Sequence, residues 1–262
     1  MRRLAWMLLL LLPVTVVAAP VSLYTYHRQP PFVLELEPRT GLMFEVAALL
    51  NQQADAQQTY DARVLPRARL NQTLAGWLDG SCAGPGAPGC DDNWMLLWVI
   101  PAWGWGERAE QRFLWVDLFK DEDLVVSTQQ HKVPYRNANS LIGQRFAALR
   151  GHHYPMGVEE LMQQGKIDRE DGNDVRASLM RIHSRRAGVT IIRRVAFYYY
   201  LQNDPQLMSI AADFYVAKQP FNQFTLQAMI PRSRPDLRDA LERAKADPAW
   251  AALFALYGIK PL

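Results

Sequence analysis

The side chains able to act as acids, bases or nucleophiles are scattered along this sequence instead of forming a known catalytic motif. It contains no GxSxG, no HExxH and no phosphate-binding loop. His27, His131 and His183 lie far apart, and an isolated histidine is more often a surface or hydrogen-bonded residue than a catalytic base. The sequence therefore predicts no catalytic residues and no cofactor.

Acidic runs and a histidine pair are the groups that could bind a metal. Acidic residues gather in Asp121–Asp123 and Asp168–Asp171, and runs of this kind are usually solvated faces. His152 and His153 are adjacent, so their side chains point apart, and no carboxylate follows them at a ligand spacing. We therefore predict no metal site.

The amino-terminal residues have the order of a secretory signal peptide. Met1-Arg2-Arg3 is followed by an apolar run over residues 4–17 and by the small pair Ala18-Ala19. The run is shorter than the roughly 20 apolar residues of a membrane-spanning helix, which makes a retained anchor the weaker alternative. We expect residues 1–19 to be removed on export to the periplasm.

The two cysteines, Cys82 and Cys90, flank a loop rich in Gly and Pro. An oxidising compartment permits a disulfide, and the flexible spacer lets the two ends meet. A redox or metal-binding role is the alternative, but the spacing is not CxxC and no histidine lies nearby. We predict a Cys82–Cys90 disulfide, which would stabilise the fold by about 2.5 kcal/mol on the chain-entropy account.

The charge balance argues against nucleic acid as a partner. The chain has 29 Lys and Arg against 26 Asp and Glu, and Arg2 and Arg3 belong to the predicted signal peptide. The rest of the chain is close to neutral, whereas a surface that binds nucleic acid carries a clear excess of positive charge.

Strand and helix patterns alternate along the remaining chain. Thr40 is expected to cap a helix, and Ser233–Asp236 has the form of a capping box. The predicted strands cover 21–26, 60–65, 94–100, two stretches within 113–128, 146–149, 189–192 and 224–230. The predicted helices lie after Thr40, over 66–77 and 157–164, after Asp174, over 193–201, and after Ser233 and Asp247.

This order of elements predicts an α/β fold class with a mostly parallel sheet covered by helices. Because two α/β sets are joined by two extended connections, we predict two lobes with two hinge crossings. Lobe 1 would comprise residues 20–125 plus 222–262, and lobe 2 residues 126–221. A ligand is expected in the cleft between them, since domain interfaces and strand ends are the usual pocket positions.

Six segments, taken in their order and spacing, carry a resemblance to a known family. They are Tyr24–Phe32, Gly41–Leu50, Leu65–Arg69, Glu107-Arg108 with Trp115–Phe119, Leu141–Arg145 with Gly151–Tyr154, and Asp247–Trp250 with Leu256–Gly258. Together they resemble the periplasmic solute-binding proteins of the polar amino-acid transporter type, over nearly the whole chain after residue 19. The resemblance implies the two-lobed type II periplasmic-binding-protein fold of bacterial extracellular solute-binding protein family 3.

For the first lobe, the resemblance implies an arginine clamp and an aromatic wall. Arg108 matches the family's arginine that binds a ligand carboxylate, because a planar guanidinium can donate two parallel N–H bonds. A surface arginine paired with a neighbouring glutamate is the alternative. The rings of Tyr26, Phe32 and Trp105 would line the cleft, or else belong to the core.

For the second lobe, the resemblance implies a turn before a helix that receives an anionic group, with His153 and Tyr154 as contacts. The family's turn usually holds small hydroxyl residues, so the histidines depart from its pattern. Arg193 stands where an acidic residue normally pairs with the ligand's ammonium group. We therefore predict a ligand without a free α-amino group or with extra negative charge, and a shifted register is the alternative.

The function expected from this resemblance is that of an exported solute-binding protein, a monomer that closes on a small polar or anionic organic solute. Its partner would be a membrane permease of the ABC transporter type or a sensor. Two alternatives remain at this point. One is an orphan sensory or interaction module of the same fold, and the other is a small-molecule dehydratase on this fold.

Overall fold

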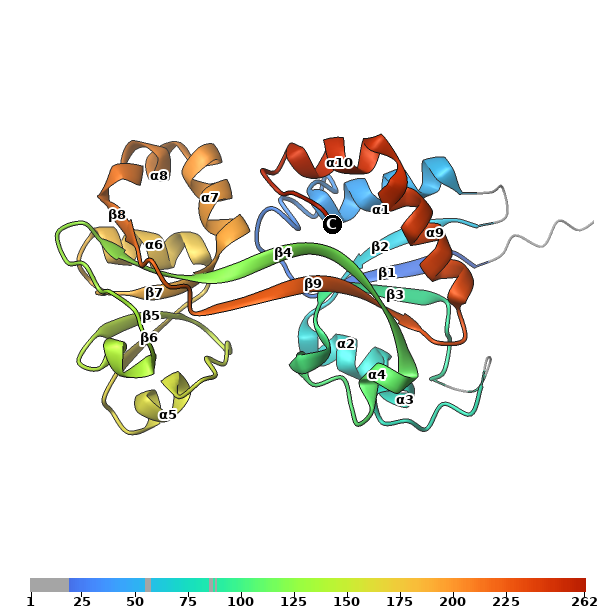
Figure 1. The fold of residues 1–262 in the computed structure, drawn as a ribbon, viewed down its shortest axis with the longest axis horizontal. Helices are drawn as coiled ribbons and strands as arrows, with labels where there is room; N and C mark the ends of the chain where they lie inside the picture. Colours follow the sequence, from blue (N-terminus) through green and yellow to red (C-terminus); the bar gives the residue numbers. More distant parts are fainter. Residues whose placement is uncertain (1–18, 55–57, 85–86, 88) are drawn as a thin grey trace, which may run out of the picture.

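The computed structural model describes residues 19–54, 58–84, 87 and 89–262. It is a two-lobed α/β structure in which two long strands run from one lobe into the other (Figure 1). The predicted signal peptide, residues 1–19, lies outside the described residues except for Ala19. Within the described ranges, no helix has the length and hydrophobicity needed to cross a membrane.

A parallel sheet forms the centre of the first lobe. Strand β1 (Val21–Thr25) lies between β2 (Tyr60–Val64) and β3 (Trp94–Val99). All residues of β3 are buried, so this strand is covered on both faces. A continuous apolar strand of this kind is typical of a sheet with helices on both sides. The prediction of a mostly parallel sheet is correct only for these three strands and is wrong for the sheet as a whole, because the strands that continue it pair antiparallel.

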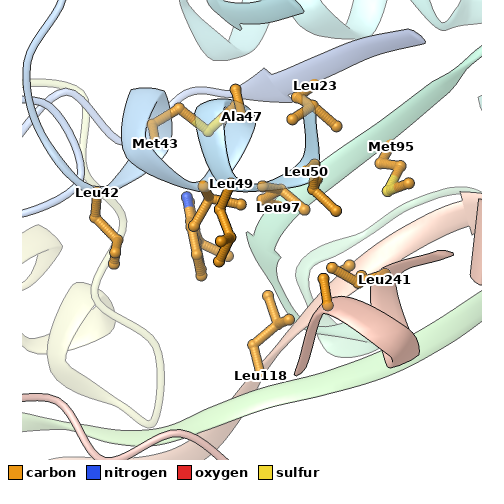
Figure 2. Packing of buried hydrophobic residues seen from close by; sticks show 14 of the residues in the cluster. Leu23, Leu42, Met43, Ala47, Leu49, Leu50, Met95, Leu97, Leu118 and Leu241 are labelled. Carbon is orange, nitrogen blue, oxygen red and sulfur yellow. The ribbon is translucent and has the colours of Figure 1, made fainter. Parts of the chain in front are cut away.

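Helices cover the two faces of this sheet. On one face lie α1 (Leu42–Gln53), α9 (Pro235–Ala246) and α10 (Pro248–Ala255). Figure 2 shows Leu23, Leu97 and Leu241 packed together there. On the other face lie α2 (Arg67–Thr73), α3 (Ala75–Leu78), η1 (Pro101–Trp103) and α4 (Ala109–Arg112). The helix predicted over 66–77 is therefore two short helices, separated at Leu74.

Strands β4 (Phe113–Thr128) and β9 (Asn222–Pro231) form an antiparallel pair that joins the lobes, and we call this pair the crossing ribbon. β3 pairs with β9, and β7 (Thr190–Arg193) in the second lobe pairs with β4, so one seven-stranded sheet extends through both lobes. The two extended stretches predicted within 113–128 are a single strand, whose register shifts between Asp117 and Phe119.

The second lobe is built around the far end of β4. Strands β7 (Thr190–Arg193) and β8 (Phe214–Val216) pair with β4, and β5 (Arg145–Leu149) pairs with β6 (Asp168–Gly172). The helices are η2 (Ala138–Leu141), α5 (Val158–Gln163), α6 (Val175–His183), α7 (Arg194–Asn203), α8 (Pro205–Ser209) and η3 (Ala211–Asp213).

The charged run Asp168–Asp171 is part of edge strand β6, a strand that the sequence patterns did not predict. Arg145 Nε on β5 lies 3.3 Å from Asp168 Oδ2 and 3.2 Å from Glu170 Oε1. These pairs across neighbouring strands help to hold β6 in place where apolar side chains are missing.

The hydrophobic clusters follow the two lobes. Two clusters draw on residues before 120 and after 225, and two draw on residues 124–221. Val195 of α7 nevertheless packs with the first-lobe cluster, and the Tyr199 ring lies 6.3 Å from the Tyr257 ring. The lobes therefore also touch where α7 approaches α10 (Figure 1). The lobe boundaries at residues 125 and 222 stay a prediction, and the division of the hydrophobic clusters supports them.

Helix α1 begins after Gly41, and the predicted cap Thr40 is wrong. Gly41 has a φ of 115°, and a Cβ atom there would lie 2.9 Å from the carbonyl oxygen of Phe32. The N–H of Met43 donates to that same carbonyl at 3.0 Å, which makes a side-chain cap unnecessary. The start of α1 therefore holds the loop that follows β1.

The capping box predicted at Ser233–Asp236 is also wrong. The Ser233 hydroxyl donates to Asp92 Oδ2 at 2.9 Å, and Asp236 accepts hydrogen bonds from the Arg234 guanidinium instead. The distant carboxylate of Asp92 and the neighbouring guanidinium of Arg234 therefore take the groups that would have formed the cap. Asp174 caps α6 as predicted, since its carboxylate accepts the N–H of Ala177.

Cys82 and Cys90 form the predicted disulfide, with their Cα atoms 5.1 Å apart. The bridge packs against α3, because a Cβ atom on Gly76 would lie 3.0 Å from Cys82 Sγ and 3.1 Å from Cys90 Sγ. The close approach explains why a residue without a side chain occupies this helix position.

Candidate functional site

Side chains from both lobes meet beside the crossing ribbon, in a region that we call the cleft. Arg193 ends β7 in the second lobe, and its Cζ atom lies 5.2 Å from the ring centroid of Trp103 in the first lobe. The same atom lies 4.9 Å from the ring of Phe224 on β9. A cation held between two rings gains a cation–π attraction at each. Arg193 therefore links the second lobe, the first lobe and the crossing ribbon.

Two carboxylates on β4 flank this arginine. Arg193 Nε lies 3.9 Å from Asp121 Oδ2 and 3.7 Å from Asp123 Oδ1. Burial raises the pKa of Asp121 to about 6, and Arg193 opposes that rise only in part. Burial also raises the pKa of Asp123. The positive charge of Arg193 is thus offset by neighbouring acids.

A second arginine lies on the first-lobe side of the cleft, at the first position of α2. The Arg67 Cζ atom lies 3.8 Å from the centroid of the Trp105 ring and 5.1 Å from that of Tyr26. Its Nη2 donates to the carbonyl of Trp103 at 3.0 Å, and its Nε donates to Asn71 Oδ1 at 2.9 Å. Among the residues that the structure describes, no carboxylate pairs with it. Arg67 therefore holds a fixed, uncompensated positive charge.

Two histidines contribute neutral rings to the cleft. His27 is buried, with Nε2 2.9 Å from the carbonyl oxygen of Trp98, and burial followed by the charge of Arg193 lowers its pKa well below the ordinary value. His152, in the second-lobe turn, has its pKa lowered to about 4 by burial and then by Arg193. His152 also lowers the pKa of His27. Both rings are therefore uncharged near pH 7.

The structure brings three of the predicted site residues into this cleft, namely Tyr26, Trp105 and Arg193. Tyr26 lies between its neighbours, with its ring 6.2 Å from Trp105 and 4.2 Å from His27. Burial raises the pKa of Tyr26, although Arg67 and Arg193 both oppose the rise. The phenol is thus a neutral hydrogen-bonding group next to two cations.

Two other predicted residues lie in hydrophobic cores. Phe32 is fully buried beneath His27, against Trp98 and Phe119. Tyr154 is buried against Phe146, and its hydroxyl accepts the N–H of Leu149. Direct contact of either residue with a ligand stays a prediction.

His153 is exposed, and its Nδ1 lies 3.4 Å from Glu159 Oε2. Arg108 is also exposed, at the start of α4 with a φ of 57°, where it lines a hollow of about 710 Å³. Phe224 lines the same hollow, which therefore adjoins the cleft. Neither Glu107 nor Glu110 forms an ion pair with Arg108 in the described part of the chain. The clamp role of Arg108 stays a prediction.

Sequence reasoning did not single out Arg67 or Asp121 as site residues. Arg67 could have been predicted, because it follows Pro66 shortly after a strand. A residue at that position begins a helix near a strand end, where ligands usually bind. No sequence feature marks Asp121, because the neighbouring residues do not distinguish a carboxylate buried in the hinge from a solvated one.

The described residues contain no group of three or more His, Cys, Asp and Glu side chains placed to hold a metal ion. The cleft offers a pair of guanidinium groups, several ring faces and two acids of raised pKa, Asp121 and Asp123. This set of groups can bind and orient a small polar molecule, with the anion at Arg67 and flat surfaces at Trp103 and Phe224.

Comparisons with known proteins bear on the fold. No protein-family model and no curated protein matches the sequence. Among solved structures, the chain is similar to an ancestral arginine-binding protein bound to arginine, with a TM-score of 0.62 and 12% identity over 92% of this chain and 99% of that one.

Two further structures are similar. An arginine 3rd transport system periplasmic binding protein from Legionella pneumophila gives a TM-score of 0.58 and 10% identity over 92% and 100% of the two chains. The ancestral amino acid-binding protein AncCDT-1, described as a precursor of cyclohexadienyl dehydratase, gives 0.59 and 13% over 91% and 95%. The chain therefore has the two-lobed fold of the periplasmic amino-acid-binding proteins, as the sequence resemblance predicted.

Proposed function

We propose that this protein is an exported solute-binding protein whose two lobes close on a small organic anion and release it unchanged. The observation that carries the proposal is the placement of Arg67, an arginine without a carboxylate partner that lies on the rings of Trp105 and Tyr26. Guanidinium is the side chain best suited to bind a carboxylate through two parallel hydrogen bonds. A cation fixed in place before binding loses little entropy when the anion arrives.

Closure of the lobes explains how binding would be signalled. The solute would contact Arg67 in the first lobe and Arg193 in the second, so both sets of contacts form together only when the lobes approach. This difference in affinity shifts the population toward the closed form. The crossing ribbon lets the lobes bend relative to each other while the sheet stays continuous.

The setting of the protein follows from the same proposal. Residues 1–19 would direct export to the periplasm, where the solute-binding fold works in the Legionella neighbour described by its name as a periplasmic binding protein. The partner would be a membrane permease of the ABC transporter type, or a sensor, that recognises the closed monomer.

Binding measurements on one matched pair of variants test the proposal. Arg67→Gln should abolish the thermal shift and the heat of binding caused by small carboxylates, whereas Arg69→Gln, on the same helix and exposed, should leave both unchanged. A ligand at 100 times its dissociation constant stabilises the folded state by about 2.7 kcal/mol, which a melting curve detects. If no carboxylate shifts the unmodified protein, the orphan interaction module becomes the better account.

A dehydratase is the second candidate, and one observation favours it. Asp121, with a pKa raised to about 6, is a buried acid in a cleft, and such groups can transfer protons near neutral pH. One structural neighbour is described as a precursor of cyclohexadienyl dehydratase. Mass analysis of a bound solute after prolonged incubation separates the two candidates. A solute-binding protein returns the solute with unchanged mass, whereas a dehydratase returns a product that has lost the mass of one water.

A further inference from the structure

Arg193 and Asp121 leave one hydrogen-bond donor and one acceptor side by side without partners. Arg193 Nη1 and Asp121 Oδ2 are both buried, and neither has a hydrogen-bond partner among the described residues. The two side chains are only 10% and 0% exposed. Nη1 is bonded to the same carbon as Nε, which lies 3.9 Å from Oδ2, so the two unpaired atoms belong to side chains that face each other. Unpaired buried polar atoms cost free energy, and a group that reaches both removes the cost.

Asp121 has one engaged oxygen and one free oxygen. Asp121 Oδ1 accepts the N–H of Glu122 at 2.9 Å, which leaves Oδ2 as its free acceptor. Asp123 on β4 is paired with Arg193 on β7 in the sheet, and its Oδ1 lies 3.7 Å from Arg193 Nε. The free atoms therefore form a defined pair, one donor and one acceptor.

The chemistry of this pair selects among ligand groups. An ammonium group donates only, so it would satisfy Asp121 but face the positive charge of Arg193. A carboxylate accepts only, so it would satisfy Arg193 but face the negative charge of Asp121. A primary carboxamide presents a carbonyl and an N–H on adjacent atoms and carries no charge. A group of that kind satisfies both atoms without repulsion.

We infer that the solute is an organic acid with a carboxylate at one end and a carboxamide, or a similar neutral donor–acceptor group, at the other. Arg67 binds the carboxylate, and Arg193 with Asp121 binds the amide edge. Trp103 and Phe224, which flank Arg193, offer flat faces to the planar amide. This inference rests on the proposed function, and it replaces the simple expectation that Arg193 attracts an acid.

Calorimetry with two pairs of probes tests the inference. Each pair is a diacid and its monoamide: succinate with succinamate, and terephthalate with 4-carbamoylbenzoate. In at least one pair, the monoamide should bind the unmodified protein about 10-fold more tightly than the diacid, the effect of one charged hydrogen bond. Asp121→Asn should reverse this order, because the new amide can donate alongside Arg193, and two donors suit a carboxylate.

Matched variants separate this effect from general damage to the hinge. Glu122→Gln is the control for Asp121→Asn, because Glu122 lies near Arg194 instead, at 4.0 Å, and the monoamide preference should survive. Arg193→Gln should abolish the preference while Arg194→Gln keeps it, which provides a second test if Asp121→Asn does not fold. Cooperative thermal unfolding of each variant confirms that it is folded.

Three outcomes would overturn the inference: diacids that bind as tightly as monoamides, an order that Asp121→Asn leaves unchanged, or no binding by either pair. The proposed function fails on a different result. If the diacids bind and Arg67→Gln removes that binding, the proposed function stands and only the amide site is wrong. If no carboxylate binds at all, both are wrong.

Discussion

The guanidinium carbon of Arg67 lies 3.8 Å from the centroid of the Trp105 ring, with the indole fully buried beneath it. The Trp105 Nε1–H donates to the carbonyl of Ile100 at 2.8 Å, so the ring cannot turn away from the arginine. Because both partners are held by further hydrogen bonds, the cation is presented to the cleft in one orientation.

Replacing the ring beneath Arg67 should weaken binding more than it weakens the fold. Trp105→Phe keeps an apolar ring in the site but removes the hydrogen bond to Ile100 and lowers the cation–π attraction, which is strongest at Trp. We expect carboxylate affinity to fall about 5-fold to 10-fold, or roughly 1 kcal/mol. Calorimetry measures this, and unchanged affinity in a folded variant would show that Arg67 does not need Trp105.

The buried acid in the hinge should make the stability of the protein depend on pH. The pKa of Asp121 is about 6 in the folded state and ordinarily 3.8, so the folded state retains a proton that the unfolded chain releases. The contribution of Asp121 to the free energy of unfolding is therefore fully present below about pH 4. It is lost as the pH rises through about 6. Burial is the main cause of the raised pKa, while Arg193 and Arg194 oppose the rise and Asp123 adds to it.

Asp121→Asn removes that titration. The variant should be more stable than the unmodified protein at pH 7 by about 1 to 3 kcal/mol, with the difference shrinking toward pH 4. Urea unfolding at several pH values measures the free energy of unfolding. A constant difference across this range would show that Asp121 does not titrate there.

Gly41 should tolerate no side chain. Gly41→Ala would place a Cβ atom 2.8 Å from the Leu34 nitrogen and 2.9 Å from the Phe32 oxygen, both backbone atoms, at a φ of 115°. We expect a loss of about 2 to 4 kcal/mol in the free energy of unfolding, from strain and displacement of the loop. Gly143→Ala is the control: its φ is 76° and nothing lies within 4 Å of the new Cβ, so it should cost only about 1 to 2 kcal/mol.

The disulfide should stabilise the first lobe without affecting the cleft. Replacing Cys82 and Cys90 together by serine should lower the free energy of unfolding by about 2 to 3 kcal/mol. Carboxylate affinity should not change, since the bridge packs on Gly76 in α3 and not on a cleft residue. The same loss of stability should appear in the unmodified protein under reducing conditions, and its absence would show that the bridge contributes little.

The fold was predictable from the sequence because its signals are local. Apolar periodicity predicted α1, and the continuous apolar run predicted β3. The errors at Thr40 and Ser233 have one cause: tertiary partners, the Phe32 carbonyl and Asp92, replaced the local cap. Edge strand β6 escaped detection because ion pairs, and not apolar alternation, hold it.

The cleft was predictable only in part. Tyr26, Trp105 and Arg193 meet there, with Tyr26 directly after β1 and Arg193 at the end of β7. The pairing of Arg193 with Asp121 and Asp123 depends on the register between β4 and β7, which sequence patterns do not supply. The acids that offset Arg193 could not be anticipated without that register.

The continuous sheet has a consequence for the cooperativity of unfolding. Since β4 contributes hydrogen bonds to strands in both lobes, neither lobe can unravel without exposing an unpaired edge on the other. The two halves should therefore denature in a single cooperative transition, and amide protons in the middle of β4 and β9 should be among the last to exchange with solvent.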